Sequence, residues 1–269
     1  MSTIQVTPDL LMHYEVDDFA PPWTRHEAVL LLHGNAESGE VWYGWMPHLT
    51  PEFRVVRPDM RGFGCSTAMP ADYPWSADRI VDDFVDLMDA LRIDEFHVVG
   101  AKVGGSFAIH LAARHPARVK TLTVMSPPIR PGDSADRYLS WADQVRESGV
   151  ETWARSTMTN RLGASFPPSG NEWWIQLMGR TARSTQIGFL SAVPKMDLTP
   201  DLPRIQCPTL VIASPGNALY PLEQVQSWQR QIRRSRLVTI PGDSYHLAAT
   251  APQECAEAFL QFVSHSANS

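Results

Sequence analysis

The sequence predicts an α/β protein with a mostly parallel, doubly wound sheet and a helical insertion. Three observations predict it: short β-branched or leucine-rich runs, amphipathic helical stretches that alternate with them, and one long segment in which the alternation stops. Strands joined through helices run parallel, and a parallel sheet is covered by helices on both of its faces.

The first strands and the first helix follow from local patterns. Met1–His26 is expected to supply a leading antiparallel hairpin. Ala28–Leu32 and Phe53–Arg57 are apolar or β-branched runs, which is typical of buried strands. Asp78–Leu91 carries apolar side chains at close to a 3.6-residue spacing, which predicts an amphipathic helix.

The middle of the core is predicted to be a strand, a helix and another strand. Phe96–Val99 is a short β-branched strand, and it leads through a glycine-rich corner into the helix Gly105–Arg114. Pro116 stops that helix, because proline cannot continue the hydrogen-bond ladder. Val119–Met125 is the next strand.

The end of the chain returns to the same alternation. Cys207–Ala213 and Leu237–Ile240 are the last two predicted strands, and Pro252–Val263 is the closing helix. Residues 1–126 and 201–269 are therefore expected to form the core.

Residues 127–200 are expected to form a helical lid inserted in the core. The segment is rich in Trp, Arg, Met and Ser, and its clearest helical pieces are Ala135–Glu147 and Glu172–Arg183. An insertion at this point of the order lies over the carboxyl ends of the strands. Each of its tryptophans is more often a core residue than part of a substrate wall.

Composition excludes several classes of function. The chain has 269 residues, of which 43% are hydrophobic and 19% charged, and its net charge is −6. These values are ordinary for a soluble globular protein and argue against broad nucleic-acid binding. We expect no membrane segment and no signal peptide. The three cysteines lack CxxC spacing, which favours a reducing compartment, so the cytoplasm is the expected location.

The strongest chemical signal is the corner Gly100-Ala101-Lys102-Val103-Gly104. It has the form of the nucleophile elbow G-x-S-x-G, with lysine in the serine position. In such a corner a strand turns sharply into a helix, so the central side chain projects above the sheet. Backbone N–H groups at the start of the helix favour negative charge beside it.

Several motifs in the right order give the chain a specific resemblance to a known family. It resembles an α/β-hydrolase of the lactonase, esterase and C–C hydrolase branch over nearly its whole length. Besides the elbow, the matching segments are His33-Gly34-Asn35-Ala36-Glu37-Ser38, Asp59-Met60-Arg61-Gly62-Phe63-Gly64-Cys65-Ser66 and Pro241-Gly242-Asp243-Ser244-Tyr245-His246.

The resemblance implies a set of site residues. His246 takes the position of the catalytic histidine, and the backbone N–H groups of Asn35 and Val103 would form the oxyanion hole. Asn217 takes the usual position of the triad aspartate, and Ser126 takes another position where the family can place its acid. Two triad positions thus depart from the family pattern, at Lys102 and Asn217.

The departures limit the chemistry. Asn217 can orient the His246 ring but cannot stabilise its cation, and an ammonium at Lys102 would disfavour that cation further. A buried lysine has a lowered pKa, and its neutral amine can act as a base or form a Schiff base with a carbonyl. Acylation of Lys102 by an ester would end in a stable amide, so serine-like turnover is not expected.

The other candidate residues carry weaker interpretations. Ser38, Trp42, Ser126 and Trp141 are candidates for substrate contact, with simple packing as the alternative for Ser38 and Trp42. Glu37 and Asp243 could replace the missing carboxylate, but each is interpreted as a solvated loop residue. No metal site is predicted, because the histidines lack partners at ligand spacing.

We therefore expect a cofactor-independent enzyme acting on a small, partly apolar carbonyl compound, with an oligomeric assembly left open. The leading hypothesis is carbon–carbon bond cleavage of the lyase, decarboxylase or retro-aldol type, centred on Lys102. Hydrolysis of a lactone, ester or amide by lysine-assisted water attack is the alternative. The third hypothesis is a non-catalytic protein that binds a small ligand in the same pocket. Separately, Lys102 could be a laboratory substitution in a serine enzyme.

Overall fold

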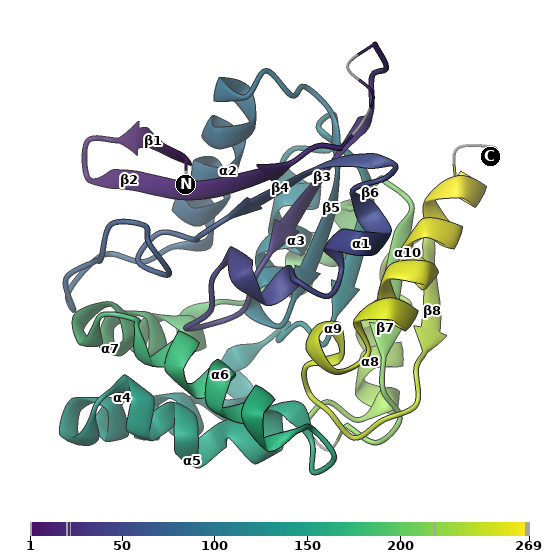
Figure 1. Ribbon diagram of the computed structural model, residues 1–269. Helices are drawn as coiled ribbons and strands as arrows, with labels where there is room; N and C mark the ends of the chain where they lie inside the picture. The colour runs from purple at the N-terminus through teal and green to yellow at the C-terminus, as the bar shows by residue number, and fades with distance from the viewer. Residues whose placement is uncertain (1, 20, 22, 218, 267–269) are drawn as a thin grey trace.

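The computed structural model describes residues 2–19, 21, 23–217 and 219–266, and these contain one eight-stranded sheet. The strand order is β1-β2-β4-β3-β5-β6-β7-β8 (Figure 1). β1 pairs with β2, and β2 with β4, in antiparallel fashion, whereas all pairs from β4 to β8 are parallel. The strands are β1 (Ser2–Thr7), β2 (Leu10–Asp17), β3 (Glu27–Leu32), β4 (Phe53–Pro58), β5 (Phe96–Ala101), β6 (Val119–Met125), β7 (Thr209–Ala213) and β8 (Ser235–Thr239).

Helices cover the sheet and fill the insertion. The core helices are α1 (Met46–Leu49), α2 (Ala77–Ala90), α3 (Val103–Arg114), α8 (Leu222–Gln229), α9 (Leu247–Thr250) and α10 (Pro252–Ser266). The lid helices are α4 (Ala135–Ser148), α5 (Val150–Leu162), α6 (Pro168–Gly179) and α7 (Arg183–Ala192). Figure 1 shows these four gathered at one end of the sheet, away from the β1–β2 hairpin.

The expected α/β fold with a mostly parallel sheet is confirmed, and the predicted strands are all present with small shifts at their ends. β5 illustrates why the pattern was readable. Each of its six residues is buried, as a central strand covered on both faces requires. The helix after it begins earlier than predicted, at Val103, because the chain turns directly from Lys102 into the helix.

The lid differs more from the expectation. The predicted helix Glu172–Arg183 corresponds to α6, which begins earlier, at Pro168, and ends earlier, at Gly179, while Arg183 already begins α7. The sequence patterns did not predict the helix α5. Its buried side chains include Trp153, Met158 and a charged residue, Arg161, so it lacks a simple apolar stripe. No helix in the described part of the chain is long and apolar enough to cross a membrane.

Candidate active site

Lys102 lies at a strained corner between β5 and α3. Its backbone has φ 55° and ψ −127°, a conformation that costs a non-glycine residue about 1–3 kcal/mol. Two glycines make the corner possible. A Cβ on Gly100 would lie 2.5 Å from the Gly104 carbonyl oxygen, and one on Gly104 would lie 2.2 Å from that of Leu32. The elbow geometry predicted from the motif is therefore present, and it directs Lys102 above the sheet.

The amine of Lys102 is buried and paired with a carboxylate, Glu37, that we expected in a solvated loop. Only 2% of Lys102 is exposed, and its Nζ donates a short hydrogen bond to Oε1 of Glu37. Glu37 is itself 1% exposed, and its Oε2 accepts a hydrogen bond of 2.8 Å from the Gly34 N–H. The interpretation of Glu37 as a solvated loop residue is wrong, because its loop folds inward beside the elbow. Asp243, the other candidate carboxylate, is exposed as expected.

His246 lies on the far side of the same carboxylate. Its Nε2 is 3.2 Å from Oε2 of Glu37, and the ring packs edge-on against Trp174 with centroids 4.9 Å apart. Since an ionised carboxylate only accepts, Nε2 carries the proton and Nδ1 is an acceptor. Nδ1 is buried and has no hydrogen-bond partner among the described residues. Glu37 thus separates the amine from the imidazole that it was expected to face.

Asn217 does not orient this ring. Its Oδ1 accepts hydrogen bonds from the N–H groups of Leu219 and Tyr220, at 3.0 and 3.3 Å. Its Nδ2 donates to the hydroxyl of Ser126 at 3.3 Å. The amide therefore holds the turn after β7, and the expected contact with His246 gives way to these local hydrogen bonds.

The charge states follow from burial and from the ion pair. Burial lowers the pKa of Lys102 to about 8, although Glu37 opposes the shift. Burial disfavours the Glu37 carboxylate, yet the neighbouring Lys102 and His246 hold its pKa well below the ordinary value. Burial also lowers the pKa of His246, against the attraction of Glu37. Near neutral pH the site contains an ionised Glu37, a neutral His246 and an amine within reach of deprotonation.

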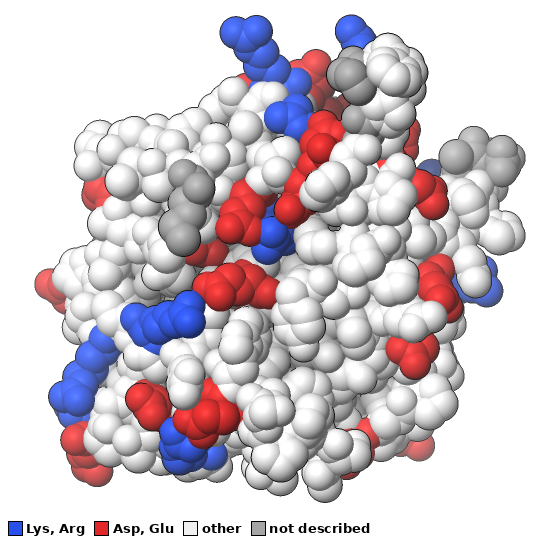
Figure 2. Space-filling view, viewed as in Figure 1, with Lys and Arg blue, Asp and Glu red and all other residues white. Residues whose placement is uncertain are grey.

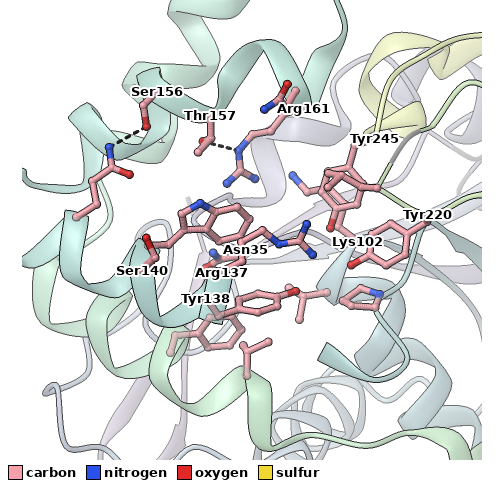
Figure 3. A pocket seen from close by; sticks show the side chains of 18 residues that line it. Asn35, Lys102, Arg137, Tyr138, Ser140, Ser156, Thr157, Arg161, Tyr220 and Tyr245 are labelled. Atoms are coloured by element: carbon pink, nitrogen blue, oxygen red, sulfur yellow. Dashed lines mark hydrogen bonds between the residues drawn. The ribbon is translucent and has the colours of Figure 1, made fainter. Parts of the chain in front are cut away.

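A cavity of about 440 Å³ opens above the elbow. Lys102 lines it together with Asn35 and Val103, whereas Glu37 and His246 do not (Figure 3). We call it the site cavity. A bound molecule would therefore meet the amine of Lys102 first. The N–H of Val103 has no intrahelical acceptor, since it begins α3. The two predicted oxyanion residues and the amine thus share one wall.

Of the four predicted substrate-contact residues, one lines the site cavity and three do not. Trp141 lines the site cavity. Ser38, Trp42 and Ser126 do not, and all three are buried elsewhere. The Ser38 hydroxyl accepts a hydrogen bond from the N–H of Glu40 at the start of a short 3₁₀ helix, and Trp42 packs against another tryptophan.

Sequence reasoning missed two arginines of the lid. Arg137 and Arg161 line the site cavity opposite the elbow (Figure 3). Their signal was weak, because neither belongs to a motif and arginine is common on helix surfaces. The burial of Glu37 was easier to predict. The loop after the first buried strand lies beside the elbow in this fold, and the lysine there would attract a carboxylate.

One cluster outside the site has metal-ligand character. His13, Asp59 and Cys65 present ligand atoms that lie within 4.8 Å of one another. Oxygens of Asp59, however, already accept hydrogen bonds from the N–H groups of Gly39 and Cys65 and contact Nδ1 of His13. These contacts hold the loop after β4 and give the cluster a structural purpose.

Comparisons with known proteins find similar chains among hydrolases. A relative from Caulobacter sp. (strain K31), whose name assigns it provisionally as carbamate hydrolase RutD, is 29% identical over 249 residues, which cover 90% of this chain and 92% of the relative. The 2-hydroxymuconate semialdehyde hydrolase of Pseudomonas sp. (strain CF600) is 31% identical over 224 residues, with 78% of this chain and 77% of the relative covered.

A solved structure supports the fold over the full length. The enol-lactonase of Burkholderia xenovorans LB400 superposes with a TM-score of 0.89 at 22% identity, covering 98% of this chain and all of that one. The family profile described as alpha/beta hydrolase fold matches residues 27–249. The chain belongs to the α/β hydrolase fold family, and its named relatives are hydrolases.

Proposed function

We propose that the chain hydrolyses a small carbonyl compound, a lactone, ester or amide, with Lys102 as the base that activates water. One observation carries the proposal: the Lys102 amine, buried and with its pKa lowered to about 8, lines the site cavity while Glu37 supports it from behind. A general base is most effective when its pKa lies near the working pH.

The steps follow from the positions of these groups. Neutral Nζ of Lys102 takes a proton from water, and the oxygen attacks the carbonyl carbon. The N–H groups of Asn35 and Val103 receive the developing oxyanion. The Lys102 ammonium then returns the proton to the leaving oxygen or nitrogen, and the products are an acid and an alcohol or amine.

Glu37 has the part that the aspartate has in a serine hydrolase. It stabilises the conjugate acid of the base, here an ammonium in place of an imidazolium. His246 donates Nε2–H to Glu37 and fixes that carboxylate, so it is a positioning residue in this scheme. Water attacks directly, and no acyl-lysine forms, which avoids the stable amide.

Carbon–carbon cleavage through a Schiff base would use the same neutral amine. The names of the relatives favour water attack over that reaction. The two are separable, because only a Schiff base leaves a reduced adduct on Lys102 when borohydride is present.

The proposal is tested with a panel of p-nitrophenyl esters, lactones and amides. We expect wild type to turn over members of the panel and Lys102→Met to lose at least about a hundredfold in kcat/KM. Lys195→Met, which removes an exposed lysine, is the matched control and keeps full activity. The double variant K102M/E37Q removes both charges and shows whether the loss follows from misfolding.

Two results would overturn the proposal. A borohydride-trapped adduct with ketones or keto acids, absent from Lys102→Met, would identify Schiff-base chemistry. An intact, well-folded wild type that binds ligands in the site cavity and turns over nothing would identify a binding protein.

A further inference from the structure

We propose that Arg161 and Arg137 form a subsite for a carboxylate of the substrate, so the carbonyl compound that reacts at Lys102 carries a carboxylate of its own. The inference rests on the proposed function and names its substrate class. The site cavity is lined by three cationic side chains, Lys102, Arg137 and Arg161, and by no aspartate or glutamate among the described residues.

Arg161 is a buried cation with no carboxylate partner in the described part of the chain. It lies in the last turn of α5 and is 6% exposed. Its Nε donates to the Thr157 hydroxyl at 3.1 Å, and its Cζ lies 4.8 Å from the ring centroid of Trp153. Buried charges in proteins are normally paired, because leaving water is costly. The unpaired guanidinium is explained if a ligand supplies the anion.

Aromatic rings hold both guanidinium groups by their faces. Trp141 lies between the two arginines, with its ring centroid 5.7 Å from Cζ of Arg137 and 5.9 Å from Cζ of Arg161. A cation–π contact stabilises the charge and leaves the N–H donors at the edge of the guanidinium plane free. Figure 3 shows both groups turned into the cavity on the side that faces Lys102.

The remaining walls are uncharged and mix apolar side chains, such as Phe189 and Val193, with polar ones. Tyr138, Tyr220 and Tyr245 line the cavity, and burial raises the pKa of each hydroxyl, so they stay neutral. The arginines are then the groups that select an anion. A carboxylate and a phosphate group can each accept hydrogen bonds from two parallel N–H donors of a guanidinium. We assign the subsite to a carboxylate, and inorganic phosphate is the competing anion in the test.

Binding of simple probes tests the subsite without any turnover. Glutarate, dimethyl glutarate and inorganic phosphate are titrated into wild type, Arg161→Gln and Arg155→Gln by calorimetry. Arg155 is on the same helix but exposed and paired with Glu172, so it is the matched control. We expect glutarate to bind and dimethyl glutarate not to bind. Arg161→Gln weakens glutarate roughly tenfold to a hundredfold, and Arg155→Gln changes nothing.

A structural role for Arg161 gives a different result. Because the free guanidinium is unpaired, ligand-free Arg161→Gln is expected to keep the melting temperature of wild type. A large drop in melting temperature would mean that Arg161 holds the lid and would overturn the subsite. Arg137→Gln, at the other side of Trp141, gives a second test and is expected to weaken glutarate as well.

The outcomes for the subsite and for the proposed function are separable. Mono-p-nitrophenyl glutarate is expected to be hydrolysed with at least tenfold higher kcat/KM than p-nitrophenyl butyrate, a preference lost in Arg161→Gln mainly through KM. Equal rates for both esters, or tighter binding of phosphate than of glutarate, would overturn the subsite and leave the hydrolase standing. Arginine-dependent glutarate binding without hydrolysis of any ester would support the subsite and overturn the proposed hydrolase activity.

Discussion

At the scale of single residues, the site depends on a carboxylate that joins two predicted groups. Lys102 and His246 were found from motif positions alone, because the elbow and the loop after the last strand have fixed places in the chain. Glu37 was named as a possible replacement carboxylate but was expected to be solvated, since its burial depends on how the loop after β3 folds and on the Gly34 N–H that holds it. The predicted role of Asn217 was wrong for the same reason, because a motif does not show its local hydrogen bonds.

The pH dependence of hydrolysis follows from the Lys102 amine. Only the neutral amine accepts a proton from water, so kcat/KM is expected to rise with pH and level off above a midpoint near 8. Glu37 raises the pKa of Lys102, so Glu37→Gln is expected to move this midpoint to lower pH. The profile is measured from pH 6 to 10. A rate that falls as pH rises through 8 would show that the ammonium, and not the amine, is the active form.

The stability of the buried pair can be tested independently of activity. Lys102→Met leaves an ionised Glu37 buried without its cation and is expected to cost about 3–5 kcal/mol in the free energy of unfolding. Glu37→Gln is expected to be similarly costly. The double variant should recover most of the loss, because no uncompensated charge remains. Urea unfolding of the four proteins measures the coupling, and additive single losses would contradict it.

At the scale of elements, the corner between β5 and α3 positions the chemistry. The strand, the glycines and the helix were readable from sequence, because each depends on residues close together in the chain. The lid was less readable. α5 mixes aromatic, apolar and charged buried side chains, so its tertiary contacts and not its periodicity set its place. The tryptophans of the lid were expected mainly in a core. Trp153 is fully buried, but Trp141 also contacts the two arginines.

The close approach of α3 to β3 makes Gly104 sensitive to substitution. Gly104→Ala would place a Cβ 2.2 Å from the Leu32 carbonyl oxygen and 2.4 Å from that of His33. The helix must move, so we expect a loss of stability of about 1–3 kcal/mol and a fall in kcat of roughly a hundredfold. Gly105→Ala, whose Cβ meets nothing closer than 3.0 Å, is the control with the smaller effect. Equal effects in urea unfolding and activity would contradict this packing.

At the scale of the whole molecule, the charge of the surface and that of the cavity differ. The chain has a net charge of −6, and Figure 2 shows acidic and basic side chains mixed over one face. The site cavity instead combines three cations from two parts of the chain, Lys102 from the core and Arg137 and Arg161 from the lid. Composition could not predict the positive charge of the cavity, because the net charge sums over the whole chain and does not show which side chains the fold brings together.

The lid and the core are expected to be coupled through charge. Arg161 on α5 lowers the pKa of Lys102, since two neighbouring cations disfavour each other. Arg161→Gln should therefore raise the midpoint of the pH–rate profile, and glutarate bound to wild type should raise the pKa of Lys102 in the same direction. Arg155→Gln on the outer face of α5 should leave the midpoint in place. An unchanged midpoint in Arg161→Gln would show that the lid does not act on the amine.

The pKa of Lys102 decides whether its amine can act as the base, and it can be measured directly. The chain has only three lysines, Lys102, Lys120 and Lys195, so protein labelled with ¹³C at the lysine ε-carbon gives three signals. Titration by NMR should show one signal with a midpoint near pH 8 that is missing from Lys102→Met. If the signal that Lys102→Met removes titrates near the ordinary lysine value of about 10.4, the amine is charged throughout the working range, and Lys102 is not the base.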